Sequence, residues 1–130
     1  MILLDTHVVI WLMTSPASIS KDAAQAIAET GSTGMRPRIS AASIYELVYA
    51  EKRGRIQLNV PHTVLLERLR ARFDLSPVTD TIALEAAAIP DSFHGDPMDR
   101  IIAATAIVEI CTLVTKDWRI RQSNVCKTLW

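Results

Sequence analysis

Short apolar runs alternate along the chain with longer segments in which apolar residues recur at helical spacing. The short runs predict strands at residues 2–4, 37–40, 75–78 and 112–115. The longer segments predict helices at 8–13, 20–29, 42–53, 61–73, 79–88 and 97–109. Short apolar strands that alternate with helices are typical of a parallel sheet covered on both faces. We therefore expect an α/β fold, a single-domain, three-layer α/β/α sandwich whose mostly parallel sheet has about four or five strands.

Residues with restricted backbone preferences mark several of the predicted boundaries. Ser20 suits the N-cap of the second helix, and Gly31 is expected to stop that helix. Gly54 is expected to end the helix that starts at residue 42. Pro77 has no backbone N–H to donate, so it confines its strand to an edge of the sheet, or else lies at the strand's end.

The composition is that of an ordinary globular domain, and we assign residues 1–130 to one domain. The 14 basic residues balance the 14 acidic ones, which excludes binding of nucleic acid by bulk positive charge alone. No apolar stretch is long enough to span a membrane, and Asp5 interrupts the first apolar run, so we expect neither a membrane segment nor a signal peptide. Cys111 and Cys126 form no CxxC pair, which favours a reducing, cytoplasmic location.

Four acidic residues lie where predicted strands end or where the next helices begin. Asp5 follows the first strand directly, and Asp117 lies just after the strand at 112–115. Glu46 and Asp99 lie in the first turns of helices. Strand ends and the starts of the following helices share one edge of a parallel sheet, and that edge is where such sheets bind ligands. We therefore expect these four carboxylates to meet in one pocket.

Carboxylates gathered at short range repel one another, so a fold keeps them together only if something offsets their charge. Arg100 and Lys116 are the obvious basic neighbours in the sequence. A hard divalent cation is the other solution, because Mg²⁺ prefers oxygen ligands and keeps several waters. Such an ion can activate water and stabilise the leaving oxygen of a phosphodiester. No cysteine or histidine spacing indicates a zinc site instead.

Each of these acids also has a purely structural interpretation. Ser43 and Glu46 fit a capping box, in which both side chains bond to the backbone of a helix start. Asp96 followed by Pro97 fits a helix N-cap, and Asp96 is the acid best explained in this way. Caps or turns explain each acid singly, whereas a shared site explains why four of them are expected at one sheet edge.

The segments that carry these acids resemble the PIN domain, and within it the VapC-type toxins of toxin–antitoxin pairs. The similar segments are ILLDTH at 2–7, SIYEL at 43–47, HGDPMDRIIAATA at 94–106 and LVTKD at 113–117. They cover nearly the whole chain in order, and DPMDRIIAATA is the most specific of them. The resemblance implies a PIN-like fold and a metal-dependent ribonuclease that a partner antitoxin inhibits.

The resemblance also implies roles for individual residues. The catalytic and metal-binding positions of the family are matched by Asp5, Glu46, Asp99 and Asp117. In the implied mechanism Glu46 orients or deprotonates a water, and a metal-bound hydroxide attacks the phosphorus of RNA. The metal would be Mg²⁺, with Mn²⁺ as the alternative. The accessory positions of the family are matched by Asp96, Thr6 and Thr115.

The implied partners are an RNA substrate, a cognate antitoxin and a second copy of the chain in a homodimer, with no membrane. We expect the antitoxin to contact the first helices around Trp11 and Leu12 with an amphipathic segment. An arginine from this partner would reach the acids and take the place of the metal's charge.

Two rival functions use similar sheets. A phosphatase or phospho-receiver fits poorly, because His7 stands where the phosphatase would have a second aspartate and no proline follows Lys116. The second rival is a non-catalytic acidic-pocket binding module of the same fold, in which the acids serve as caps. Metal binding at the acidic edge discriminates between this module and the ribonuclease.

Three further residues near the acids have two interpretations each. His7 suits a buried or capping role better than contact with substrate. His94 either contacts RNA or shapes the turn before the helix at 97–109. Trp118 either stacks on a base or covers the sheet edge.

Overall fold

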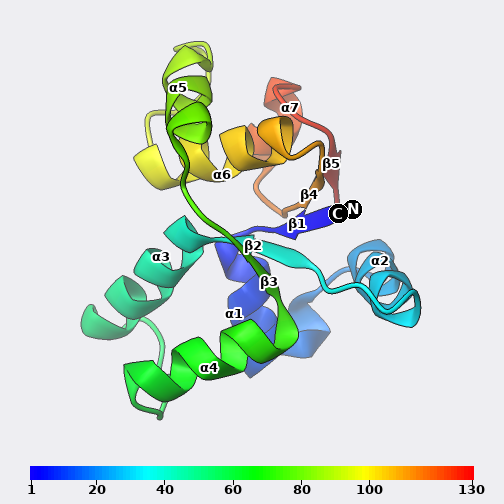
Figure 1. Ribbon diagram of the computed structural model, residues 1–130, viewed down its shortest axis with the longest axis vertical. Coiled ribbons are helices and arrows are strands. Elements are labelled where there is room, and N and C mark those ends of the chain that lie inside the picture. Colours follow the sequence, from blue (N-terminus) through cyan, green and yellow to red (C-terminus); the bar gives the residue numbers. More distant parts are fainter.

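The computed structural model describes residues 1–130 and contains one five-stranded parallel sheet (Figure 1). The strand order is β3-β2-β1-β4-β5, and every neighbouring pair runs parallel. The strands are β1 (Ile2–Leu4), β2 (Arg38–Ser40), β3 (Asp74–Ser76), β4 (Thr112–Val114) and β5 (Thr128–Leu129). The predicted parallel α/β architecture is therefore confirmed, with β3 at an edge and ending just before Pro77 as expected.

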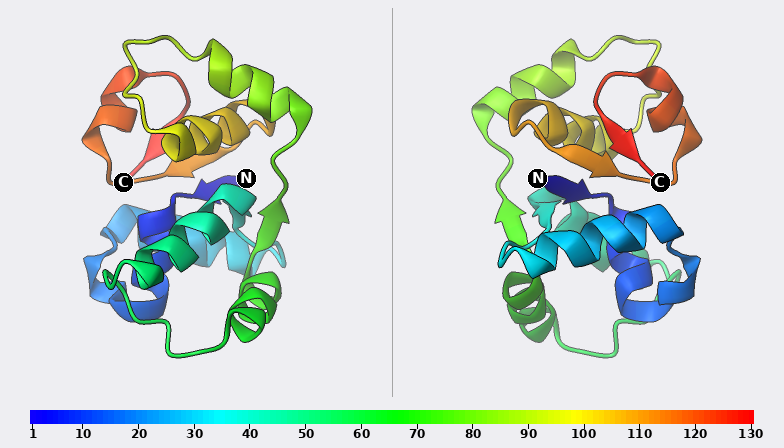
Figure 2. Two further views of the ribbon diagram at one scale, coloured as in Figure 1. Left: turned by 90° about the vertical axis from the view of Figure 1, so that its left-hand side faces the viewer. Right: turned by 90° about the vertical axis from the view of Figure 1, so that its right-hand side faces the viewer.

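Helices cover both faces of the sheet, as Figure 2 shows. On one side lie α1 (Thr6–Thr14), α2 (Lys21–Ser32), α3 (Ala41–Lys52) and α4 (His62–Arg72), with a short 3₁₀ helix at Pro16–Ser18. On the other lie α5 (Asp80–Ala88), α6 (Pro97–Val108) and α7 (Trp118–Ser123). None of these helices is both long and apolar enough to cross a bilayer.

The sheet separates two hydrophobic cores, because successive side chains of a strand point to opposite faces. Leu3 of β1 packs with Ile102 of α6 in one core. Its neighbours Ile2 and Leu4 pack in the other, which also contains Leu47 of α3. Both cores are therefore anchored on β1, the central strand, and the residue that follows it is held firmly in place.

Several local predictions need correction. Gly31 does not stop α2, which continues to Ser32, because glycine lowers helix stability without forbidding the conformation. Ser40, not Ser43, is the N-cap of α3, so the predicted capping box of Ser43 and Glu46 is wrong. α7 and β5 were not predicted from the sequence, since both are too short for a periodic pattern to develop.

Candidate active site

The carboxyl ends of β1 and β4 and the first turns of α3 and α6 meet at one edge of the sheet. Asp5 follows β1, Glu46 lies in the second turn of α3, and Asp99 lies in the first turn of α6. These three side chains line one cavity of about 460 Å³. Asp117 lies beyond the end of β4 and borders a second hollow, and His7 lines both spaces. The four acids predicted from the sequence thus gather around one point of the fold.

Asp5 is the most firmly held of these acids, with 3% of its surface exposed. It is the N-cap of α1, and its Oδ1 accepts a hydrogen bond of 2.7 Å from the Thr6 backbone N–H. Its Oδ2 accepts one of 2.7 Å from the hydroxyl of Thr115. The same Thr115 oxygen accepts the backbone N–H of Asp117 at 3.0 Å. Thr115 therefore ties Asp5 to the start of the segment that carries Asp117.

Glu46 points toward Asp5 rather than toward the backbone of its own helix. The hydroxyl of Thr6 donates a hydrogen bond of 2.6 Å to Glu46 Oε1 and lies 2.9 Å from Ser43 Oγ. Burial raises the pKa of Glu46; the Thr6 hydrogen bond opposes this rise, and the charge of Asp5 adds to it. Ser43 and Glu46 therefore both contact Thr6 of α1. This contact between two helices takes the place of the predicted capping box.

The carboxyls of Asp99 and Asp117 have opposite electrostatic surroundings. Burial, followed by the negative charges of neighbouring carboxylates with Asp5 first among them, raises the pKa of Asp99 to about 8. Burial also acts to raise the pKa of Asp117, but hydrogen bonds from the Arg119 side chain and backbone outweigh it and leave this pKa lowered. At neutral pH and without a cation, Asp99 therefore keeps its proton while Asp117 is ionised.

His94 joins the acids from the loop that precedes α6. Its Nε2 lies 3.3 Å from Asp99 Oδ2, yet this buried nitrogen makes no hydrogen bond. His94, Asp99 and Asp117 each present a ligand atom, and these atoms all lie within 4.8 Å of one another. A carboxylate-rich set with one orphaned imidazole nitrogen fits a divalent cation. The sequence signal for this residue was its place two positions before Asp96 in the loop at the helix start.

His7 has a bracing role that its hydrogen bonds define. The backbone N–H of Lys116 donates to His7 Nε2 at 2.9 Å, so this nitrogen carries no proton. The proton of the neutral ring is then on Nδ1, which lies 3.4 Å from Asp5 Oδ2. His7 consequently connects the Asp5 carboxylate to the chain that leaves β4, in agreement with the structural role preferred from the sequence.

Asp96 is the N-cap of α6, as predicted, with Pro97 in the first helical position. Its Oδ1 accepts the backbone N–H groups of Met98 at 2.9 Å and Asp99 at 3.4 Å. The Asp96 side chain nevertheless lines the same cavity as the other acids, and its charge helps to raise the pKa of Asp99. Capping and a contribution to the site are therefore compatible for this residue.

Comparison with known proteins agrees with this geometry. The PIN domain family model matches residues 2–125. Ribonuclease VapC22 of Mycobacterium tuberculosis is 39% identical over 120 residues, which cover 92% of this chain and 89% of that protein. Among solved structures, VapBC2 from Rickettsia felis bound to a DNA fragment from their promoter aligns with a TM-score of 0.75 at 16% identity, over 99% of this chain and 98% of that one.

A second solved structure, a toxin–antitoxin complex from Klebsiella pneumoniae, aligns with a TM-score of 0.60 at 23% identity, over 90% of this chain and 87% of that one. At these identities the two structures show a shared fold. The family match and the VapC22 similarity each extend over nearly the whole chain. The chain therefore belongs to the PIN-domain family, and its similarities within that family are to VapC proteins.

Proposed function

We propose that this protein is a divalent-metal-dependent endoribonuclease and the toxin of a toxin–antitoxin pair. The observation that carries the proposal is the convergence of acids from separate segments on one cavity at the sheet edge. The 39% identity to a protein named as a ribonuclease supports RNA as the substrate. A set of acids that merely capped helices would have no reason to face one another.

The metal ligands we propose are Asp5, Asp99 and Asp117, with Glu46 as a ligand or a base and His94 as an added nitrogen donor. Carboxylate oxygens suit Mg²⁺ and Mn²⁺, and an imidazole nitrogen favours the softer of the two, Mn²⁺. A bound divalent cation supplies acidity to water and neutralises charge that develops on the phosphate and the leaving oxygen. A cation held by these residues would displace the proton that Asp99 otherwise keeps.

Glu46 is the group we assign to proton transfer. Its carboxylate faces the cavity, and the Thr6 hydroxyl fixes its orientation through the 2.6 Å hydrogen bond. Burial raises its pKa, which makes its carboxylate a stronger base than that of an ordinary glutamate. Glu46 would accept a proton from the attacking water as the water oxygen bonds to phosphorus. The P–O bond to the ribose oxygen of the neighbouring nucleotide would break, and that oxygen would take a proton from solvent water and leave as a hydroxyl.

The proposed antitoxin site is a second cavity of about 330 Å³ on the α1 and α4 side of the sheet. Leu12 and Met13 of α1 line it together with Leu65 of α4, and Arg68 and Arg72 lie at its border. An apolar segment that carries acidic residues would match this combination. Trp11 and Leu12 were both predicted to contact the antitoxin; Leu12 lines this cavity, and Trp11 lies outside it with its ring centroid 5.6 Å from that of Trp130. A homodimer remains a prediction that sedimentation of the isolated protein would test.

One experiment separates the ribonuclease from a non-catalytic binding module. The purified protein is incubated with a panel of structured and unstructured RNAs, with Mg²⁺, with Mn²⁺, and with EDTA. We expect cleavage that requires the cation and that disappears in Asp99→Asn. RNA that stays intact under every ion, while the cation still binds, would favour the binding module.

A further inference from the structure

The carboxylate cluster repels the backbone of the substrate that we propose for it. Asp5, Glu46, Asp96 and Asp99 all face the cavity into which a phosphodiester must enter. The chain as a whole has a net charge of zero, so it offers no general attraction for a polyanion. Affinity for RNA must therefore come from local groups beside the acids.

A surface of tyrosine and arginine forms one wall of the cavity. Tyr45 and Tyr49 of α3 both line it, and their rings stack with centroids 5.6 Å apart and planes 9° apart. Tyr45 is 58% exposed, an unusual condition for so large an aromatic side chain. The Arg53 guanidinium lies 5.2 Å from the Tyr49 ring centroid, and Arg55 lines the cavity directly. We call Tyr45, Tyr49, Arg53 and Arg55 the tyrosine surface.

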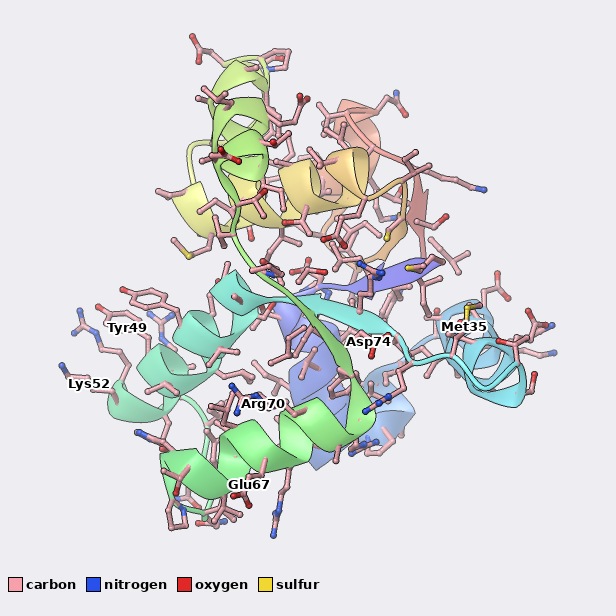
Figure 3. The ribbon with its side chains drawn as sticks, in the orientation of Figure 1. Met35, Tyr49, Lys52, Glu67, Arg70 and Asp74 are labelled. Atoms are coloured by element: carbon pink, nitrogen blue, oxygen red, sulfur yellow. The ribbon has the colours of Figure 1, made fainter.

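The local sequence explains why these groups share one surface. Tyr45, Tyr49 and Arg53 follow one another at intervals of four, which places them on one face of α3 that continues to its C-cap. Figure 3 shows Tyr49 and Lys52 projecting outward from this end of the helix. Gly54 then adopts a φ of 71°, and the Arg55 N–H bonds back to the Ala50 carbonyl at 2.9 Å. This turn brings Arg55 back to the cavity.

A second aromatic and cationic surface lies on the other side of His7. Trp118 follows Asp117 and is 63% exposed. It borders a hollow together with Trp11, Lys116 and Arg119. The Lys116 ammonium lies 5.5 Å from the Trp11 ring centroid. We call Trp11, Lys116, Trp118 and Arg119 the tryptophan surface.

We propose that the two surfaces are nucleobase-stacking subsites on either side of the scissile phosphate. This proposal rests on the ribonuclease function proposed above. Every base has a flat π-face, so exposed aromatic rings beside arginine and lysine bind single-stranded nucleic acid without needing a sequence. Each surface lines a space that also contains acids, Asp99 among them in the cavity and Asp117 in the hollow, and the two spaces meet at His7. Stacking of bases on both surfaces would offset the repulsion between the RNA phosphates and the carboxylates, so that the RNA strand lies across the site.

Steady-state cleavage of a short unstructured RNA tests the proposal. Tyr45→Ala and Trp118→Ala should each raise KM roughly five- to hundredfold, the effect of losing one stacked base, with kcat largely kept. Trp118→Phe should recover much of the loss, because it restores an aromatic face. Leu84→Ala is the control, since Leu84 is an apolar residue on α5 that is even more exposed, at 74%. Unchanged KM in both alanine variants would overturn the proposal.

Abasic substitution of the RNA gives a second and more direct readout. An oligonucleotide that lacks a single base beside the cleavage site keeps all its phosphates but loses one stacking partner. We expect the abasic RNA to bind the wild-type protein more weakly, and we expect this penalty to disappear for one flanking base in Tyr45→Ala and for the other in Trp118→Ala. A penalty that persists in both variants would contradict stacking on these rings.

The outcomes also distinguish this proposal from its alternatives. If no RNA is cleaved under any condition, the proposed function fails and the stacking surfaces fail with it. If RNA is cleaved with unchanged KM in both variants, only the stacking surfaces fail. If Tyr45→Ala instead dissociates a dimer in sedimentation and leaves KM unaltered, the tyrosine surface is a contact between copies of the chain, and the proposal is overturned for that side.

Discussion

The Thr115 hydroxyl donates a hydrogen bond of 2.7 Å to Asp5 Oδ2 across a sequence separation of 110 residues. Both residues are buried, and they follow β4 and β1, which pair directly at the centre of the sheet. The bond fixes the Asp5 carboxylate from one side while the Thr6 backbone fixes it from the other. Asp5 is therefore oriented before any ligand arrives.

Replacement of Thr115 by valine should lower both the stability of the protein and its affinity for a cation, because Asp5 loses a hydrogen bond that orients it. The side chain keeps its shape, but Asp5 Oδ2 and the Asp117 N–H each lose a partner. We expect the free energy of unfolding to fall by about 1.5–3 kcal/mol, the range for a hydrogen bond to a charged group, and cation affinity to weaken. Chemical denaturation and calorimetric titration with Mn²⁺ measure the two effects. Thr115→Ser keeps the hydroxyl, so a loss of equal size in that variant would refute the explanation.

Asp99→Asn should abolish cation-dependent cleavage without unfolding the chain. Metal-free Asp99 already keeps its proton at neutral pH, so a neutral amide resembles that state, and above a pH of about 8 the amide also removes repulsion from the surrounding carboxylates. The melting temperature without metal should hold or rise, while the stabilisation that a divalent cation gives should vanish. Asp91→Asn provides the control, because Asp91 is exposed in the loop after α5. Full cleavage by Asp99→Asn would remove this residue from the proposed site.

The raised pKa of Asp99 predicts a distinctive pH dependence for the metal-free protein. In the folded chain Asp99 binds its proton up to a pH of about 8, against an ordinary value of 3.8. Between these values the folded state binds more protons than the unfolded state, so the Asp99 contribution makes stability fall as pH rises through this window. Cation binding should strengthen over the same window, because the ion displaces the proton.

Thermal melts between pH 5 and about 9, with and without Mn²⁺, check both trends. The gap between the two melting curves should widen toward high pH. In Asp99→Asn, the part of the fall in stability with rising pH that Asp99 causes should be absent. A gap of constant width in the wild-type protein would contradict the assignment of the proton to Asp99.

Glu46→Gln should separate catalysis from folding. Ser40 is the N-cap of α3, so the substitution removes no helix cap. The glutamine side chain can still accept the hydrogen bond from the Thr6 hydroxyl. We expect stability to be kept and the cleavage rate to fall by roughly 10²–10⁴, the effect of a positioned acid or base. Glu67→Gln on the exposed face of α4 is the control, and Figure 3 shows that residue far from α6. Near-normal cleavage rates of Glu46→Gln at every Mg²⁺ concentration would contradict a catalytic role for Glu46 and leave Asp5, Asp99 and Asp117 as the acids of the site.

Topology explains why the meeting of the four acids was predictable. In a parallel sheet the ends of strands and the starts of helices fall on one edge whatever the details of packing. Asp5 and Asp99 could therefore be placed together from the positions of β1 and α6 alone. The same rule could not predict which side chains hydrogen-bond to these acids, as Thr115 does to Asp5.

The missed side-chain contacts of the site join segments that are distant in the sequence. His94 lies near Asp99 on the loop after α5, where the Arg100 side chain donates to the carbonyls of Ile89 and Phe93. No local pattern in that loop encodes these contacts. Ser43 illustrates the opposite error, since a pattern that fits a capping box serves instead to contact Thr6 of α1.

The central place of β1 in the sheet also determines when the site can exist during synthesis. Chains emerge from the ribosome N-terminus first, so Asp5 is made before the residues of β4 and the segment after it that surround its carboxylate. Thr115 and Asp117 are made more than 100 residues later, and β1 lacks one of its neighbours until β4 has emerged. The carboxylate cluster can therefore be completed only after β4 has paired with β1 and Asp117 has followed it. For the proposed ribonuclease, nascent chains that end before Asp117 would carry an incomplete site.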